Sequence, residues 1–199
     1  MLTPAASVTT ASVTTEGIST VNKPVKLASK EKVAAALDTP TDLSQEGVDK
    51  ISAAMNTILA DTFALYLKTK NFHWHVSGPH FRDLHLMFDE QGTEILGTTD
   101  EIAERVRKIG GTTLRSIGQI GKLQTLEDND EAFVPAIDML RELMNDNKKV
   151  VKAMREAHEI ADKYDDTATA SLLENFIDAA EKRVWFLFEA SRAQGDNAR

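Results

Sequence analysis

Residues that face inward recur at intervals of three and four from Asp42 to about residue 190, and this helical period restricts the fold more than any other feature of the chain. The first helix is predicted to begin after a capping residue, Asp42 or Ser44, and to run to about Trp74. Its inward positions are Val48, Ile51, Met55, Ile58, Leu59, Thr62, Leu65 and Tyr66. Because no β pattern interrupts the period, the chain is predicted to be all-α.

Glycine and proline mark the ends of the second helix. Ser77-Gly78-Pro79 breaks the chain, and the next helical stretch starts near Phe81 and ends at Gly110-Gly111, a C-terminal glycine signal. The connector that follows, Thr112–Asp130, is long and is predicted to be a crossover that contains one short helix.

Two further helices complete the pattern. The third is predicted from about Glu131, with Pro135 in its first turn, to about Lys163, and the fourth starts at Asp165-Asp166-Thr167. Four long helices with one long connection in the middle predict a ferritin-like four-helix bundle. We expect this bundle to span residues 42–193, between a flexible N-terminal tail, 1–41, and a short C-terminal tail, 194–199. The inward positions of the last two helices are Leu140, Leu143, Val150, Val151, Met154, Leu172, Leu173, Phe176, Ile177, Ala180, Val184, Leu187 and Phe188.

Composition excludes several classes of function. The 199 residues include no cysteine, so disulfides, thiolate zinc sites, iron–sulfur clusters and thiol nucleophiles are excluded, and any metal must be bound by nitrogen and oxygen. No apolar run approaches the roughly 20 residues that cross a bilayer, and no secretory signal opens the chain, so we expect a cytoplasmic protein. The net charge of -8 argues against nucleic-acid binding over the whole surface and favours cations.

A lysine cluster in the predicted tail leaves two interpretations open. Lys23, Lys26, Lys30 and Lys32 are opposed only by Glu31. The segment is either a solubilising tail or a flexible electrostatic hook for DNA phosphates, which would associate the protein with the nucleoid.

Five residues of metal-ligand type lie between Phe72 and Glu104, namely His73, His85, Asp89, Asp100 and Glu104. Imidazole and carboxylate together suit iron or zinc. The last four share one face of the second helix, within roughly 100° of arc. Asp89 and Asp100 are nevertheless about 16 Å apart along the axis, at about 1.5 Å per residue, which is too far for one ion. One chain therefore carries two half-sites.

An antiparallel pair of these helices about a two-fold axis would bring the half-sites level with each other. His85 and Asp89 of one chain would then meet Asp100 and Glu104 of the other, giving two identical sites per dimer. Gly92 and Gly97 flank the midpoint, where missing side chains would let the helices approach closely. This arrangement requires a continuous helix through Gly92–Thr99, although that stretch has poor helix propensity. No Glu-x-x-His occurs in the chain, which disfavours a di-iron centre inside one bundle.

The remaining histidines and the neighbouring aromatic residues have simpler interpretations. His75, His80 and His158 are expected to be structural or exposed. Phe72 and Trp74, on either side of His73, are expected to be packing residues rather than redox groups.

The segment from Asn71 to His85, followed by Phe88-Asp89-Glu90 and by Asp100-Glu101-Ile102-Ala103-Glu104-Arg105 up to Gly110-Gly111, resembles the Dps family of miniature ferritins. The similarity covers about residues 45–190 and includes Glu181-Lys182 with Trp185. The resemblance implies a hollow shell of twelve subunits, built from two-fold dimers, that oxidises Fe(II) with hydrogen peroxide or dioxygen, preferably the peroxide, and stores ferric mineral against oxidative damage. It further implies a ferroxidase site of His73, His85 and Asp89 from one subunit and Asp100 and Glu104 from its two-fold neighbour.

One position departs from the family pattern, and other functions stay open. The family usually has acidic pore residues early in the fourth helix, where this chain has Ser171; the candidates to replace their charge are Asp165, Asp166, Asp178 and Glu181. Besides the ferroxidase, the alternatives are a DNA-compacting nucleoid protein with a secondary metal site and a shell that holds another divalent ion such as zinc.

Overall fold

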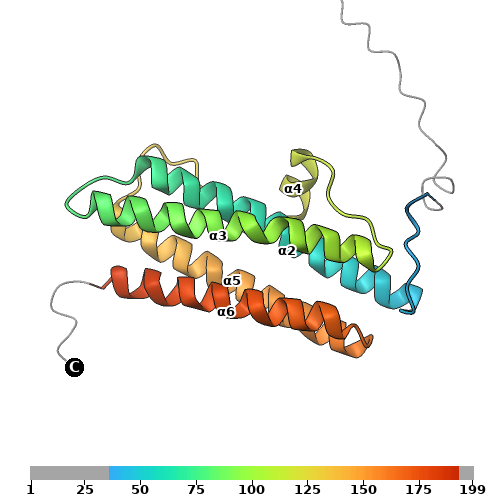
Figure 1. Ribbon diagram of the computed structural model, residues 1–199. Helices are drawn as coiled ribbons and strands as arrows, with labels where there is room; N and C mark the ends of the chain where they lie inside the picture. Colours follow the sequence, from blue (N-terminus) through green and yellow to red (C-terminus); the bar gives the residue numbers. More distant parts are fainter. Residues whose placement is uncertain (1–35, 193–199) are drawn as a thin grey trace, which may run out of the picture.

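The computed structural model describes residues 36–192, and within them it contains helices and no strands (Figure 1). This confirms the predicted all-α, ferritin-like class. Residues 1–35 and 193–199 lie outside the described part of the chain, and with them the predicted C-terminal tail and the cluster of Lys23, Lys26, Lys30 and Lys32. The helices are α2 (Gln45–His75), α3 (Phe81–Lys108), α4 (Ile117–Leu123), α5 (Ala136–Lys163) and α6 (Thr167–Ala190).

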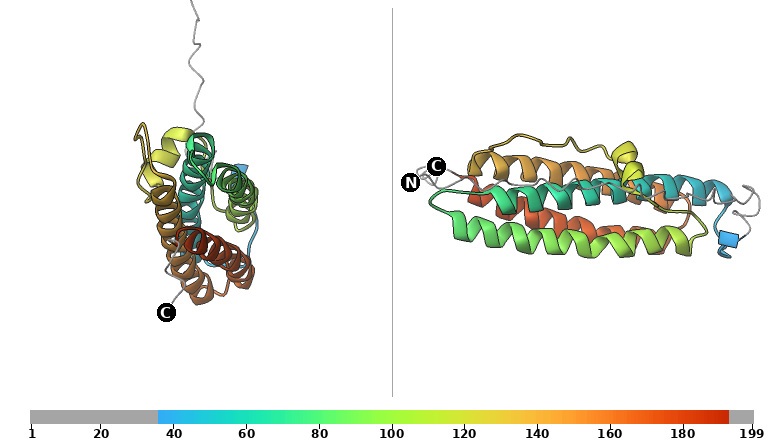
Figure 2. Two further views of the ribbon diagram at one scale, coloured as in Figure 1. Left: turned by 90° about the vertical axis from the view of Figure 1, so that its left-hand side faces the viewer. Right: turned by 90° about the horizontal axis from the view of Figure 1, so that it is seen from above.

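The four long helices form two antiparallel hairpins. α2 packs along α3 and α5 packs along α6, while α2 and α5 make the main contact between the hairpins. Viewed end-on, the four helices form one bundle, and the short α4 lies against the outside of α2 (Figure 2). No helix in the described part of the chain combines the length and apolar character needed to cross a membrane.

Local capping explains where the helices begin and end. Ser44 caps α2 by accepting a hydrogen bond from the Gly47 backbone N–H at 3.2 Å. α3 ends at Gly110, whose φ of 88° is in the left-handed region that favours glycine. Asp166 caps α6 through the Thr169 backbone N–H at 3.0 Å. These ends agree with the predicted ones.

The predicted start of the third helix was wrong. α5 begins at Ala136, with Pro135 as its N-cap at φ -58° and ψ 142°, whereas the prediction began the helix near Glu131. A proline ring disfavours helical backbone in the residue before it, so the helix does not extend back through Val134. The connector is therefore longer than predicted.

α3 is continuous through Gly92–Thr99, as the half-site interpretation requires. Its buried apolar side chains are Leu84, Phe88, Ile95, Ile102 and Val106, and they line the face that packs in the bundle. This one-sided burial leaves the opposite face of α3 uncovered in the subunit. Asp100 and Glu104 are exposed there, whereas His85 and Asp89 are half-buried at its border with α2.

Candidate metal centre

Two histidines hold each other in place where α2 ends and α3 begins. The rings of His73 and His85 stack with centroids 3.8 Å apart. His73 Nδ1 donates to the His85 carbonyl oxygen at 2.7 Å, and His85 Nδ1 donates to the His73 carbonyl oxygen at 2.8 Å. Because a carbonyl oxygen only accepts hydrogen bonds, each Nδ1 carries the proton. In the neutral ring, each Nε2 therefore has the free lone pair that a metal ion requires.

Asp89 lies one turn after His85 and faces the same pair of rings. Its Oδ1 is 3.9 Å from His73 Nε2, and its side chain is half exposed. An ion with bonds of about 2.1 Å to each atom can span a gap of at most about 4.2 Å, so one ion can reach both. Of the five predicted ligands, the structure thus brings His73, His85 and Asp89 together.

Lys70 adds a cation that no motif of the sequence indicated. Its Nζ is 2.5 Å from Asp89 Oδ1. The hydrogen bond from Lys70, and then its positive charge, lower the pKa of the Asp89 carboxyl below its usual range. Lys70 and Asp89 belong to different helices, and no short motif in the sequence relates them.

Asp100 and Glu104 lie toward the other end of α3 and are exposed. Glu104 is paired with Lys108, one turn further on, at 3.1 Å. Within residues 36–192 of one chain, no three or more histidine and carboxylate side chains are arranged to hold a metal ion. Each of the two sets is therefore incomplete by itself.

The two glycines at the midpoint of α3 have different surroundings. A Cβ added at Gly97 would have no neighbour within 4 Å, so this position faces open space. A Cβ at Gly92 would lie 3.1 Å from Lys70 Cδ, so the missing side chain accommodates Lys70 of the same chain. The prediction that Gly92 makes room for a partner helix was incomplete, since its own subunit already uses the space.

The other histidines do not join the candidate site. His75 is exposed and its Nδ1 bonds to the Asn71 carbonyl oxygen at 2.8 Å, and His80 is exposed at the start of α3. His158 lies 3.3 Å from both Asp162 and Glu174 on the α5–α6 side. All three are structural or exposed, as predicted.

Phe72 and Trp74 have opposite environments. Phe72 is 1% exposed and packs in the core, as expected. Trp74 is 58% exposed, so it does not pack in the core of its own subunit, and its expected packing role stays a prediction. A helix places residues two apart on different faces, and only one of these faces meets the bundle.

One proposed pore residue has another role. Asp166 is buried and accepts hydrogen bonds from Arg105 at 2.5 Å and from the hydroxyl of Thr169. Its charge therefore anchors α6 to α3 and is not available to line a pore. Ser171, Asp165, Asp178 and Glu181 are all exposed.

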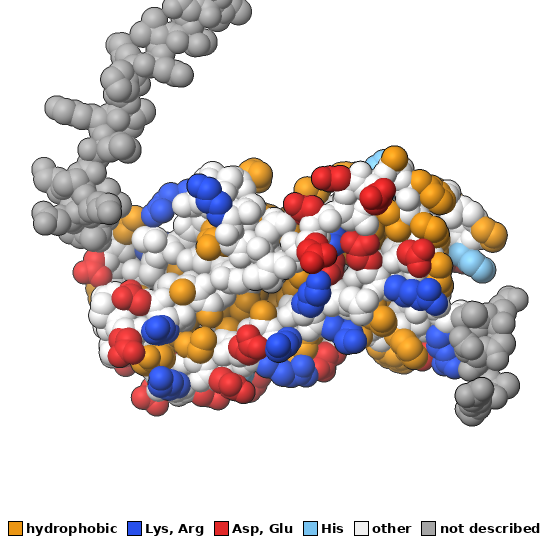
Figure 3. All heavy atoms as spheres, turned by 180° about the vertical axis from the view of Figure 1, so that it is seen from behind, with side chains coloured by type: hydrophobic (Ala, Val, Ile, Leu, Met, Phe, Trp, Pro, Cys, Tyr) orange, Lys and Arg blue, Asp and Glu red, His pale blue; other side chains and the backbone are white. Residues whose placement is uncertain are grey.

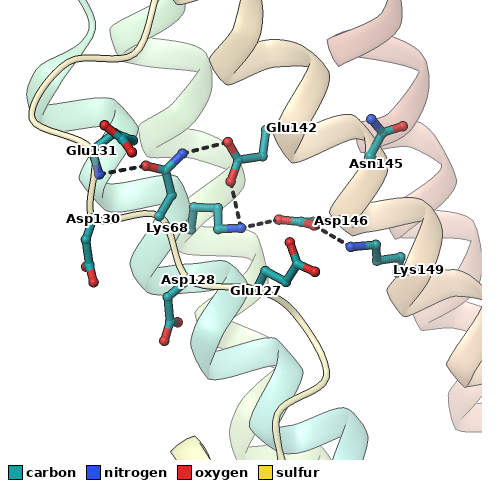
Figure 4. Close-up of a pocket in the computed structure, with 10 residues that line it drawn as sticks. Lys68, Glu127, Asp128, Asp130, Glu131, Glu142, Asn145, Asp146 and Lys149 are labelled. Carbon is teal, nitrogen blue, oxygen red and sulfur yellow. Dashed lines mark hydrogen bonds and ion pairs between the residues drawn. The ribbon is translucent and has the colours of Figure 1, made fainter.

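A separate acidic pocket of about 510 Å³ lies between α2, the connector and α5 (Figure 4). At its floor the ammonium of buried Lys68 lies 2.8 Å from Glu142 and 2.7 Å from Asp146. The side chains of Glu127, Asp128, Asp130 and Glu131 lie around it. Lys68 pairs with both innermost carboxylates, and Lys149 lies 3.7 Å from Asp146 as a second cation, so the floor of this pocket is a structural ion-pair cluster.

Large apolar side chains are exposed at one end of the bundle. Trp74, Phe81, Trp185 and Phe188 are 46% to 60% exposed and belong to the end of α2, the start of α3 and the end of α6. The prediction that Phe188 faces inward was wrong, because it lies at the end of α6, where the bundle no longer covers it. Apolar surface gathers at this end, on the right in Figure 3. Contiguous exposed apolar surface is typical of protein contacts.

Comparison with known proteins agrees with the fold. Residues 52–191 match the Ferritin-like domain family. The DNA protection during starvation protein of Brevibacillus brevis is 34% identical over 137 residues, 69% of this chain and 91% of that protein. DNA protection during starvation protein 1 of Deinococcus radiodurans is 31% identical over 73% of this chain and 70% of that protein.

Solved structures extend the similarity to three dimensions. A Dps protein from Bacillus brevis superposes with a TM-score of 0.72 at 31% identity, over 75% of this chain and all of that one. The chain therefore belongs to the ferritin-like proteins and, among them, to the Dps family.

Proposed function

We propose that this protein is a ferroxidase that oxidises Fe(II) at sites shared between two subunits. His73, His85 and Asp89 of one subunit would bind iron together with Asp100 and Glu104 of its two-fold neighbour. The observation that carries the proposal is that one continuous helix has two incomplete ligand sets on the same face. Asp89 of one set and Asp100 of the other are about 16 Å apart along the helix axis, at a rise of about 1.5 Å per residue.

The free face of α3 supports a two-fold contact. Leu96 is 40% exposed there, and Gly97 faces open space. An antiparallel pairing over these residues places His73, His85 and Asp89 of each subunit beside the partner's Asp100 and Glu104. The two-fold axis then makes two identical sites. Membership of the Dps family and the exposed apolar end of the bundle support further assembly into a shell of twelve subunits.

The ligand types suit reversible binding followed by oxidation. Imidazole Nε2 atoms with a free lone pair and carboxylates are ligands suited to Fe(II), and Glu104 has two oxygens with which to contact a second iron. Two Fe(II) ions each give one electron to hydrogen peroxide, which takes up two protons and leaves as two waters. Paired transfer avoids release of hydroxyl radical. The net charge of -8 favours cation entry and storage of ferric mineral inside the shell.

A subunit-mixing experiment tests the shared site. His85→Ala and Asp100→Ala each damage one half-site, so each variant alone should oxidise Fe(II) with peroxide at a background rate. When the two are unfolded, mixed and reassembled, every heterodimer has one intact site, and random pairing restores about a quarter of all sites. A matched control mixes His85→Ala with Asp89→Ala, which damage the same half-site and restore none.

The outcomes separate the possibilities. Recovery in the first mixture but not in the second supports a shared site. No recovery in either mixture, from particles of full mass, would contradict it. If anomalous scattering shows that the protein isolated from cells holds zinc at these residues and iron oxidation is absent, the site is one for another divalent ion.

DNA binding is a second candidate function, favoured by the names of the two relatives and by Lys23, Lys26, Lys30 and Lys32. A tail that neutralises several phosphates gives an affinity that falls steeply with salt. Gel shifts at rising salt test this with residues 1–35 deleted. The deletion stops before Leu37, whose carbonyl oxygen accepts a hydrogen bond from Arg107 at 2.8 Å, so the bundle keeps that contact. If salt-dependent DNA binding survives the deletion, residues 1–35 are not the DNA-binding segment.

A further inference from the structure

The ammonium of Lys70 lies at the half-site formed by His73, His85 and Asp89. Its side chain is only 17% exposed, and it ends 2.5 Å from Asp89 Oδ1. A surface lysine would extend into solvent, whereas this one lies along the outside of α3 and bonds to a carboxylate from that helix.

The backbone of α3 is shaped to admit this side chain. Gly92 lies three residues after Asp89, and a Cβ there would come within 3.1 Å of Lys70 Cδ and 3.7 Å of Lys70 Cγ. Any other residue would displace the middle of the lysine stem. The path of Lys70 is therefore fixed from its stem to its charged end.

Lys70 occupies the oxygen that an incoming metal ion needs. Asp89 Oδ1 is both the atom bonded to Lys70 Nζ and the atom 3.9 Å from His73 Nε2. An ion that joined Oδ1 to Nε2 would stand close to the ammonium, and the two positive charges would repel each other in a partly desolvated place. The ion and the ammonium therefore compete for the same carboxylate oxygen.

We propose that Lys70 is a resident counter-ion of the half-site, which binds Asp89 in the absence of metal and is displaced when a divalent ion binds. The inference rests on the proposed function of this site. Lys70 keeps Asp89 aimed at the histidines, and the cost of displacing it weakens the binding of the ion. Weak retention suits a site that must pass its oxidised iron onward.

Metal titration of the assembled protein tests this without turnover. Co²⁺ is added in the absence of oxidant, and its visible absorption and calorimetric heat report binding. Lys70→Met keeps the stem and removes the charge, and it should tighten Co²⁺ binding about ten- to hundredfold, the equivalent of one charge-assisted hydrogen bond. Lys70→Arg keeps a cation and should stay weak. Lys152→Met, which removes an exposed lysine paired with Glu156, is the matched control for net charge and should bind like the parent.

Asp89→Asn separates failure of this inference from failure of the proposed function. If Asp89→Asn binds Co²⁺ as the parent does, the proposed site itself is misplaced. If Asp89→Asn loses binding but Lys70→Met binds no more tightly than the parent, only the role of Lys70 is overturned. Particle mass is measured first, and Lys70→Gln replaces Lys70→Met in the same comparison if the latter does not assemble.

Discussion

His73 and His85 position each other, since each ring donates its Nδ1 hydrogen to the backbone carbonyl of the other residue, at 2.7 and 2.8 Å. The two residues lie on different helices on either side of the α2–α3 turn. The same two hydrogen bonds therefore stabilise the turn and orient the metal ligands. Both Nε2 atoms are thereby kept free as metal ligands.

Loss of either ring should remove a ligand and also release its partner. His73→Ala and His85→Ala are each expected to slow peroxide-driven Fe(II) oxidation at least about a hundredfold, because a lost ligand and a lost supporting bond act together. Stopped-flow absorbance of the ferric product measures this. His75→Ala, an exposed histidine on the same turn, should oxidise iron at the parental rate, and an equal loss in that variant would contradict the assignment.

A bulky residue on the free face of α3 should block assembly. Gly97→Arg places a long cation where a Cβ would have no neighbour within 4 Å, so the subunit should fold normally while losing its two-fold contact. Native mass spectrometry should then show subunits smaller than the parental particle, with iron oxidation at background. Gly121→Arg introduces the same side chain at another open position, on α4, and should assemble fully.

Lys68 should be important for stability. Although burial lowers its pKa, hydrogen bonds and charges from Asp146 and Glu142 outweigh this and raise the pKa of Lys68 above 10.5. Lys68→Met leaves the 3% exposed Asp146 without its closest cation and should cost about 3 kcal/mol in urea unfolding. Adding Asp146→Leu should recover part of the loss.

The pH dependence of that loss has a definite sign. A lysine whose pKa is raised by folding stabilises the fold fully below the unfolded pKa, and the contribution disappears as pH rises through the folded pKa. The difference between the parent and Lys68→Met should therefore be constant near neutral pH and shrink above pH 10.5. A difference that grew with alkaline pH would refute this origin.

Gly111 is required for close packing after α3. A Cβ there would lie 2.1 Å from Ser52 Oγ and 2.9 Å from Val106 Cγ1, so Gly111→Ala should destabilise the fold by about 1–3 kcal/mol. Ser52→Gly removes the first clash and should recover part of the stability in the double variant. Gly121→Ala, within α4 and with no neighbour in reach, should be neutral or slightly stabilising. Thermal unfolding of all four proteins provides the comparison.

The sequence by itself determined the helices, their caps and the spacing of the candidate ligands. Ser44, Gly110 and Asp166 act through neighbours within a few residues, and the distance between Asp89 and Asp100 follows from the rise of a helix, so local rules suffice. The start of α5 was misplaced because one proline outweighed the helical period before it.

Only the tertiary structure decided which other residues meet the candidate ligands and which side chains are buried or exposed. Lys70 meets Asp89 from another helix, Gly92 makes room for that lysine, and Asp166 is bound by Arg105. Trp74 is exposed while Phe72 is buried because the bundle covers one face of α2 there. Each of these facts depends on how two helices are placed against each other, and that placement results from packing of the whole core, which no short stretch of sequence encodes.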